Sequence, residues 1–198
     1  MRENCMENVF NNYERQDFQN KEMIIVLNND KMNLDKWLKE TTKHENVKVF
    51  KLDEKITLGE CLNFGVSKSK YDFIAKFDDD DYYGPKYLSD SIKAFEFTDA
   101  DVIGKSASFV YFKKSKTLAI RSSRNENKYV KHMDGCTFII KRSVFDKIKF
   151  ADIPRAIDVQ FSKDCIRNGL KIYSTNKYHH VYIRHGYPNK HTWKISDK

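Results

Sequence analysis

Four consecutive aspartates, Asp78 to Asp81, follow an apolar segment that ends at Phe77. Two carboxylates about 4 Å apart repel each other by about 1 kcal/mol in water and by about 4 kcal/mol at an effective dielectric constant near 20. A divalent cation would offset this repulsion, since Mg²⁺ or Mn²⁺ prefers carboxylate oxygens and keeps coordination positions open for substrate phosphates. The aspartates therefore predict a metal and diphosphate site. The competing interpretation is a solvated acidic turn that caps a helix beginning near Pro85.

The segments before the aspartates have the lengths and patterns of alternating strands and helices. Short apolar runs predict strands, and apolar residues on one face predict helices. In chain order we expect a helix around Met6–Tyr13, a strand at 23–27, a helix at 33–43, a strand at 47–52, a helix at 58–69 and a strand at 71–77. This alternation is typical of βαβ units and a parallel sheet covered by helices. Ligands of such sheets bind at the carboxyl ends of strands, where both Asn28 and the aspartates lie.

The second half of the chain has shorter β-like runs. After a helix that carries Leu88, Ile92 and Phe95, we expect strands at 101–104, 107–112, 117–120 and 136–140, a loop at 121–132, a helix at 156–169, and strands at 170–174 and 179–186. Gly169 suits the carboxyl-terminal cap of that last helix. Residues 1–198 are predicted to form one α/β domain.

Composition excludes several classes of protein. The chain carries 36 Lys and Arg against 28 Asp and Glu, a formal net charge of +8, but the lysines are dispersed and no nucleic-acid-binding motif accompanies them. We therefore expect no nucleic-acid partner. No apolar stretch approaches the roughly 20 residues of a membrane-spanning helix, and the amino terminus has no signal-peptide core. The prediction is a cytoplasmic protein, with peripheral membrane association left open. Its four cysteines are far apart in the sequence, which indicates reduced core thiols.

Several motifs in order resemble the family 2 glycosyltransferases of the GT-A fold. The stretch "FDDDDYYGPKYL" resembles the family's Leu-Asp-X-Asp-Asp pattern with a following aromatic residue and proline. Upstream, Gly59, Asn63 and Gly65 match its Gly and Asn-Xaa-Gly positions. The segments "MIIVLNND", "DGCTFIIKRSVFDKI" and "AIDVQFSKDCIRNGLKIYS" resemble the nucleoside-binding strand, the acceptor-side strand and helix, and the segment with the catalytic base. The resemblance covers nearly the whole chain. It implies a GT-A mixed sheet flanked by helices, with a nucleotide-binding half at 1–100 and an acceptor-binding half at 101–198.

The resemblance implies a role for each matching residue. Asp78 and Asp80 would contact the ribose and bind a Mn²⁺ or Mg²⁺ ion that bridges two phosphates, with Asp79 and Asp81 as close alternates. Asn28 would contact the base or ribose. Asp158 would deprotonate the acceptor hydroxyl, unless it is only a helix N-terminal acid. Other implied phosphate or metal contacts are Arg184, His185 and His191, and for the histidines an ordinary surface or core position competes with a ligand role.

The implied reaction moves a sugar from a nucleotide-diphosphate donor of the UDP or dTDP type to a glycan, polymer or lipid-linked acceptor, with inversion. Three positions depart from the family pattern. The chain begins about where the helix after the family's first strand should begin, Leu27 and Asn28 replace an acidic pair, and Ile157 stands where Glu is typical. Two alternatives remain open. One is a sugar nucleotidyltransferase, and the other is an inactive or truncated relative that acts as a glycan- or nucleotide-binding module.

Overall fold

The computed structural model describes residues 2–185. Three short 3-10 turns, η1 (Glu3–Cys5), η2 (Gly135–Thr137) and η3 (Arg142–Asp146), accompany the longer elements. The α-helices are α1 (Met6–Glu14), α2 (Leu34–Thr41), α3 (Leu58–Lys68), α4 (Tyr87–Ile92), α5 (Ala94–Phe97) and α6 (Ile157–Arg167). The strands are β1 (Met23–Leu27), β2 (Val47–Lys51), β3 (Phe73–Ala75), β4 (Tyr82–Tyr83), β5 (Val102–Gly104), β6 (Ser108–Phe112), β7 (Thr117–Arg121), β8 (Lys128–Tyr129), β9 (Ile139–Lys141), β10 (Ile172–Ser174) and β11 (His180–Arg184).

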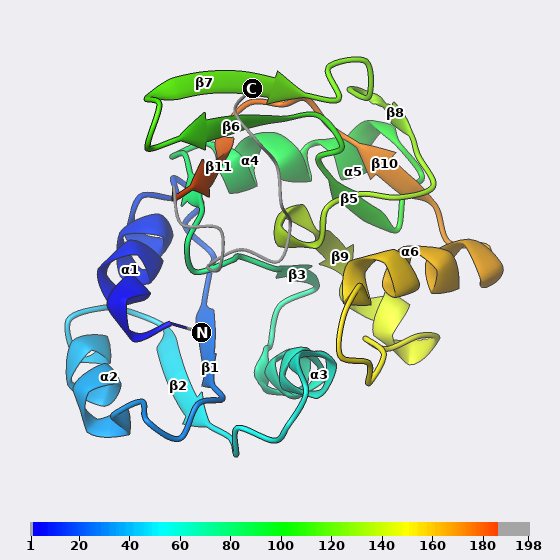
Figure 1. The fold of residues 1–198 in the computed structure, drawn as a ribbon. Helices are drawn as coiled ribbons and strands as arrows, with labels where there is room; N and C mark the ends of the chain where they lie inside the picture. The colour runs from blue at the N-terminus through cyan, green and yellow to red at the C-terminus, as the bar shows by residue number, and fades with distance from the viewer. Residues whose placement is uncertain (1, 186–198) are drawn as a thin grey trace.

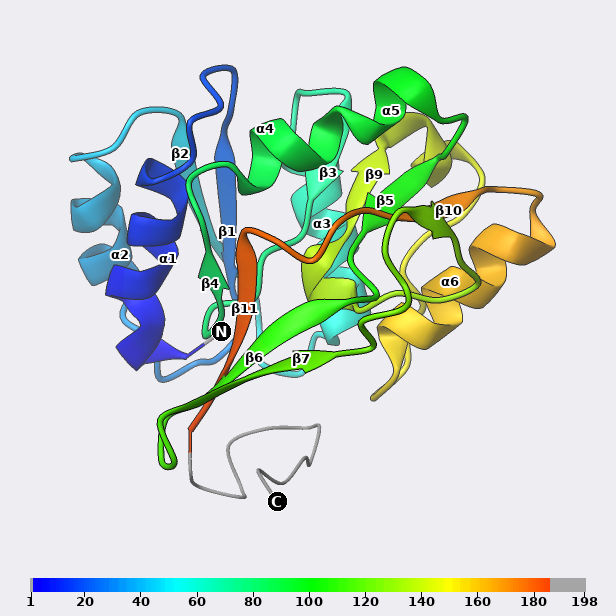
Figure 2. The same ribbon diagram turned by 90° about the horizontal axis from the view of Figure 1, so that it is seen from above.

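The strands form three sheets with both parallel and antiparallel pairs. β1 and β2 make a parallel two-stranded sheet, a five-stranded sheet has the order β3-β9-β5-β10-β8, and a four-stranded sheet has the order β4-β11-β6-β7. Helices α1 and α2 lie on one side of the β1–β2 sheet and α3 on the other (Figures 1 and 2). The predicted mixed α/β architecture flanked by helices is confirmed.

The prediction of one parallel sheet through the first half of the chain is wrong. β3 is shorter than expected and pairs antiparallel with β9, which lies in the second half of the chain. β4, which directly follows the aspartates, pairs antiparallel with β11 from the far end of the described chain. Consequently the two larger sheets are built from strands of both halves. The loop that carries the aspartates connects them.

Local sequence explains where the helices begin and end. The Asn33 side chain accepts a hydrogen bond from the Lys36 N–H at 3.1 Å and caps α2. Thr57 and Glu60 form a capping box at the start of α3. After α6, Gly169 has a left-handed φ of 69°. This conformation suits glycine and confirms its predicted capping position.

The largest core cluster packs α6 against the five-stranded sheet. Phe161 of α6 is fully buried, with its ring centroid 4.6 Å from that of Phe150. A second cluster surrounds Trp37 and joins α1 and α2 to β1. Two leucines of α2 and α3 lie outside the core, since Leu38 is 42% and Leu58 is 53% exposed.

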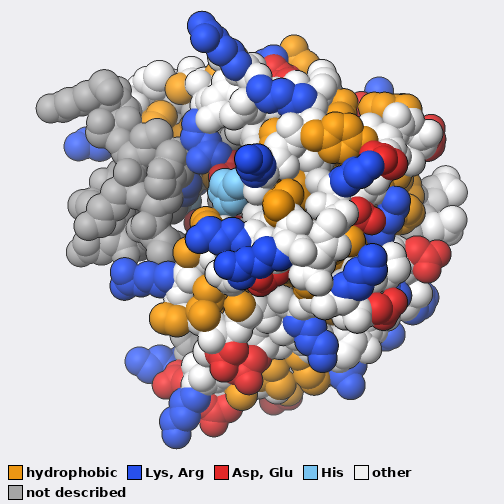
Figure 3. All heavy atoms as spheres, turned by 90° about the vertical axis from the view of Figure 1, so that its right-hand side faces the viewer, with side chains coloured by type: hydrophobic (Ala, Val, Ile, Leu, Met, Phe, Trp, Pro, Cys, Tyr) orange, Lys and Arg blue, Asp and Glu red, His pale blue; other side chains and the backbone are white. Residues whose placement is uncertain are grey.

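Cys61, Cys136 and Cys165 are buried free thiols as predicted, whereas Cys5 is only half-buried. Lys and Arg side chains are spread among acidic and neutral ones over the face drawn in Figure 3. This agrees with the dispersed charge of the sequence. Among residues 2–185, no helix has the length and apolar character needed to cross a membrane.

Candidate active site

A cavity of about 500 Å³ lies where the aspartate loop meets η2 and the start of α6. Its walls combine carboxylates with several cations and a few apolar side chains. The charged lining residues are Arg2, Lys76, Asp78, Asp80, Asp81, Arg121, Asp134, Arg155, Asp158 and Arg184. Thus the structure brings Asp78, Asp80 and Asp158 to one cavity, although they are distant in sequence. Exposed Leu58 also lies in this wall, which explains why its side chain is not in the core.

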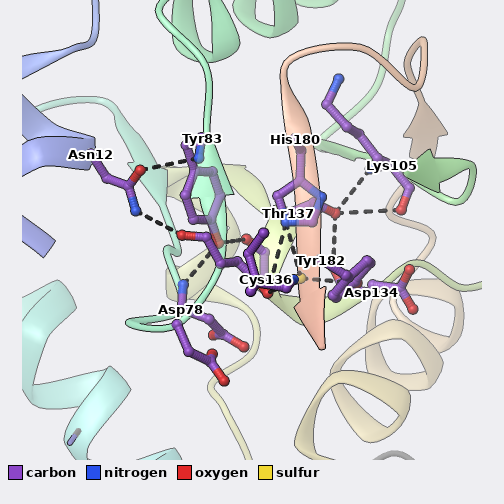
Figure 4. Close-up of polar contacts among 12 residues, drawn as sticks. Asn12, Asp78, Tyr83, Lys105, Asp134, Cys136, Thr137, His180 and Tyr182 are labelled. Carbon is purple, nitrogen blue, oxygen red and sulfur yellow. Dashed lines mark hydrogen bonds and ion pairs between the residues drawn. The ribbon is translucent and has the colours of Figure 1, made fainter. Parts of the chain in front are cut away.

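Tyr83 fixes the position where the aspartate loop begins. Its ring is fully buried, and its hydroxyl accepts a hydrogen bond from the Asp78 N–H at 2.8 Å while donating to the Cys136 carbonyl at 2.8 Å (Figure 4). The Tyr83 N–H donates to the Asn12 side chain at 3.1 Å. One buried tyrosine therefore ties the aspartate loop to both η2 and α1.

Two amides of α1 hold the rest of the loop from the other side. Asn8 donates to the Asp79 and Asp81 carbonyls, and Asn12 donates to the Asp81 carbonyl, each at 2.9 Å. These bonds satisfy backbone acceptors that a tight polar loop would otherwise leave unpaired. The loop geometry is consequently fixed by the protein without any ligand.

Asp81 has a structural environment different from that of its neighbours. Its side chain is buried, accepts a hydrogen bond from the Ile183 N–H at 3.1 Å, and lies 3.5 Å from His180 Nε2. Cys136 Sγ lies 3.9 Å from the same nitrogen and donates to the Tyr182 hydroxyl at 2.9 Å. Burial raises the pKa of the Cys136 thiol well above its ordinary value, so it stays protonated. We interpret this group as a buried polar network that supports the cavity wall.

The other three aspartates have cationic partners from the chain itself. Arg2 Nη1 lies 2.7 Å from Asp79 and 2.8 Å from Asp80, and Lys76 forms an ion pair with Asp78. The counter-charge for these carboxylates therefore does not have to come from a metal ion alone. Lys76 and Arg2 supply much of that charge.

The Lys76 ammonium also controls the ionisation of Asp78. Burial would raise the pKa of Asp78, but Lys76 opposes it, and His180 and Arg2 add to that effect, so the pKa of Asp78 is lowered. The Asp78 side chain remains 42% exposed. It is thus an ionised carboxylate at neutral pH that solvent and ligands can reach.

The aspartate loop fits a hard divalent cation. Asp78, Asp80 and Asp81 each offer a carboxylate oxygen, and these oxygens lie within 4.8 Å of one another. Oxygen donors in this arrangement suit Mg²⁺ or Mn²⁺. His185 belongs to neither of the two close groups of potential ligands found in the described part of the chain. His191 lies outside the described residues.

Asp158 lies in the first turn of α6 and its carboxylate is held by backbone groups. Its Oδ1 accepts from the Val159 N–H at 2.9 Å, and its Oδ2 accepts a long hydrogen bond of 3.4 Å from Gly135. A Cβ at Gly135 would lie 2.7 Å from the Asp158 Cβ, so only glycine allows this approach. Asp158 is therefore a helix N-terminal acid that also faces the cavity.

Two other predicted contacts lie elsewhere. Asn28 follows β1 and, like Asp79, is not among the described side chains that line this cavity. Their roles as donor contacts remain predictions. Arg184 does line the cavity, as the resemblance implied.

Sequence reasoning missed several residues of the site. Arg121 pairs with Asp134 in the cavity wall, and Tyr182 lines the cavity and accepts a hydrogen bond from Cys136. Each comes from a strand or loop whose neighbours are set by tertiary pairing. The one available hint was Lys76, because a charged residue inside an apolar strand segment needs a nearby partner.

Comparisons with known proteins agree with this geometry. The family model described as Glycosyl transferase family 2 matches residues 1–149. A search of curated proteins returned no match. Among solved structures, S. aureus TarS 1-349 superposes with a TM-score of 0.69 at 16% identity, over 90% of this chain and 56% of that chain. A crystal structure of the same TarS segment in complex with UDP-GlcNAc gives 0.71 at 16% identity, over 96% and 58%.

At this identity the TarS comparison establishes the fold, which is that of GT-A glycosyltransferases, and the chain spans a little over half of the TarS segment. The family match covers most of the chain, including the aspartate loop and Gly135. The chain belongs to glycosyl transferase family 2.

Proposed function

We propose that this protein transfers a sugar from a nucleotide-diphosphate donor, of the UDP or dTDP type, to an acceptor hydroxyl on a glycan, polymer or lipid-linked molecule. The observation that carries the proposal is the single cavity lined by the carboxylates of the aspartate loop and by Asp158. A complex of TarS with UDP-GlcNAc supports a nucleotide-sugar donor. The family match argues against a sugar nucleotidyltransferase.

Asp78 and Asp80 would hold a divalent ion, Mn²⁺ or Mg²⁺, which when bound offsets the charge that develops on the departing diphosphate. Arg184 and Arg121, from β11 and β7, are placed to add positive charge on the same cavity. Asp158 would accept the proton of the acceptor hydroxyl as that oxygen attacks the anomeric carbon from the side opposite the diphosphate. Direct displacement of this kind inverts the anomeric carbon.

One observation favours the alternative of an inactive, binding-only relative. Arg2 and Lys76 already pair with Asp80 and Asp78, so a cation must displace or reorient them to bind. An active enzyme would bind Mn²⁺ and lose sugar transfer in both Asp80→Asn and Asp158→Asn. A binding module would retain glycan or nucleotide binding in Asp80→Asn.

The test is a screen of UDP- and dTDP-sugars for Mn²⁺-dependent hydrolysis and transfer, with calorimetric binding measured in parallel. Asp158→Asn should leave Mn²⁺-dependent donor binding nearly intact while transfer falls by about 10²–10⁴-fold, the usual contribution of a general base. Full transfer activity in Asp80→Asn would overturn the metal role. Full activity in Asp158→Asn would place the base elsewhere.

A further inference from the structure

One face of the four-stranded sheet β4-β11-β6-β7 is turned away from the core. Val110, Phe112 and Tyr182 point inward, where they form a core cluster with Cys136. Side chains alternate between the two faces of a strand, so the residues between them on β6 and β11 point outward. The strand register aligns these outward positions across the sheet. We call them the outward face, and its members are Tyr82, Phe109, Tyr111, Leu118, Ile120, Val181 and Ile183.

The outward face is apolar and open to solvent. Each of its side chains is aromatic or aliphatic, and none of them is buried. Leu118 and Ile120 of β7 are 58% and 49% exposed. Tyr178, also exposed, adds its ring 6.1 Å from that of Phe109. A contiguous exposed apolar surface of this kind indicates a surface that binds a partner.

Three lysines border this face at the connection between β6 and β7. Lys113, Lys114 and Lys116, which we call the lysine turn, are all exposed. The Lys113 N–H donates to the Arg184 carbonyl at 2.9 Å, so the pairing of β6 with β11 continues up to the turn. Figure 2 shows this turn projecting from the body of the molecule at the lower left. Residues 102–125 contain six Lys or Arg and no Asp or Glu, so the apolar face lies beside a strongly basic stretch of chain.

This combination fits an anionic lipid surface better than a protein surface. Lysine is depleted where proteins bind one another. At a membrane surface, anionic headgroups attract Lys side chains, while aromatic and aliphatic side chains enter the boundary between headgroups and acyl chains. Tyr82 and Tyr111 suit that boundary because their rings are apolar and their hydroxyls are polar.

We propose that the outward face and the lysine turn dock this protein on the surface of an anionic lipid bilayer. Leu118 and Ile120 enter the headgroup region, and the lysines contact the lipid phosphates. On the opposite face of the same sheet, Arg121 and Tyr182 line the active-site cavity. Docking therefore holds the cavity one sheet thickness from the bilayer, which suits the lipid-linked acceptor of the proposed function. Binding to the bilayer itself does not depend on that function.

The direct test is co-sedimentation of the whole chain with vesicles of phosphatidylglycerol or of phosphatidylcholine. Each lysine near an anionic surface contributes a factor of about five, so we expect phosphatidylglycerol to bind about a hundredfold more tightly at low salt. This preference should shrink as salt rises. Equal binding to the two lipids, or binding to neither, would overturn the proposal.

Two sets of variants locate the contact. Replacing the three lysines of the lysine turn by Gln should weaken binding to phosphatidylglycerol by about 30–100-fold. Replacing Lys31, Lys39 and Lys43, which are exposed on and around α2, removes the same charge and should weaken it much less. Leu118→Ser should weaken binding by about tenfold or more, whereas Phe97→Ser, at an exposed ring of α5, should not. Equal losses in the two lysine sets, or in the two Ser variants, would contradict docking by this face.

A site-specific readout separates insertion from general adhesion. In Leu118→Trp, brominated phosphatidylglycerol should quench tryptophan fluorescence more than in the wild type, and in Phe97→Trp it should not. Quenching that is the same in both variants would refute the proposal. A dimer that forms without lipid and dissociates in Leu118→Ser, measured by sedimentation velocity, would assign the outward face to a second copy of the chain and would also overturn it.

Discussion

The ion pairs of Arg2 predict that this residue competes with a divalent cation for the aspartate loop. Its guanidinium contacts Asp79 and Asp80 at 2.7 and 2.8 Å, yet its side chain is 44% exposed, so it can move into solvent. Replacing it by Gln keeps much of the side-chain length and removes the charge. The change Arg2→Gln should therefore tighten Mn²⁺ binding.

The size of the effect follows from two contributions. Breaking a partly exposed ion pair costs about 0.2–1 kcal/mol. A unit positive charge and a divalent ion roughly 6 Å apart in water repel each other by about 1.4 kcal/mol before salt screening. Together the two amount to about 1.6–2.4 kcal/mol before screening. Since about 1.4 kcal/mol corresponds to a factor of ten, we expect Mn²⁺ to bind Arg2→Gln at least about tenfold more tightly at low salt.

The assay is titration of the protein with Mn²⁺, followed by the electron paramagnetic resonance signal of the free ion. The gain should shrink as salt rises, because the Debye length falls from about 30 Å at 0.01 M to about 3 Å at 1 M. Lys43→Gln is a matched control, since Lys43, just after α2, pairs with Glu40 at 2.8 Å and does not line the cavity. Unchanged or weaker Mn²⁺ binding in Arg2→Gln, at every salt concentration, would refute the reasoning.

Three more predictions concern the site and the core. Gly135→Ala should lower sugar transfer by at least about tenfold, while the affinity for Mn²⁺ stays within about twofold of the wild type. The reason is that the new Cβ would lie 2.7 Å from Asp158 and would not clash with the aspartate loop. Equal losses of transfer and of Mn²⁺ affinity would contradict this. Burial lowers the pKa of Lys105 to about 8 from its ordinary value of 10.5. Between these two pH values the unfolded chain binds more protons than the folded one, so the free energy of unfolding should rise with pH there by about 1–3 kcal/mol. Lys105→Met should flatten that part of the profile of Tm against pH. Phe161→Ala should lower the free energy of unfolding, measured with denaturant, by about 3–5 kcal/mol because the ring is fully buried. Ile166→Ala, on the exposed side of the same helix, should lower it much less. Similar losses in the two variants would contradict the assigned packing.

Much of the fold could be predicted because the apolar runs and helix caps are local features. The boundaries of β1, β2 and α3 agree closely with the predicted ranges, and Gly169 caps α6 as expected. Strand partners were less accessible to sequence reasoning. An apolar run indicates burial, but it does not say that β3 will pair with β9 from much later in the chain.

Most acids of the cavity could be predicted, whereas Arg184 was the one predicted residue among its described cations. A run of aspartates after an apolar segment is unusual enough to notice, and family motifs identified Asp158 as its partner across the sequence. Arg2 carried no comparable pattern, and Lys76 gave only the hint of a charged residue inside an apolar strand segment, since both pairings depend on the path of the loop in space. For the same reason, the support that the loop receives from the buried Tyr83 hydroxyl emerged only from the structure.

In the proposed function, the aspartate loop shares one divalent cation with a nucleotide diphosphate. The most direct measurement is calorimetric titration of the protein with UDP, in Mn²⁺ and then in a metal chelator, on the wild type and on Asp80→Asn. We expect UDP to bind wild type at least about tenfold more tightly with Mn²⁺ than without it, and Asp80→Asn to lose most of that difference, about 1.4 kcal/mol or more. Equal UDP affinity with and without Mn²⁺ in the wild type would contradict the account.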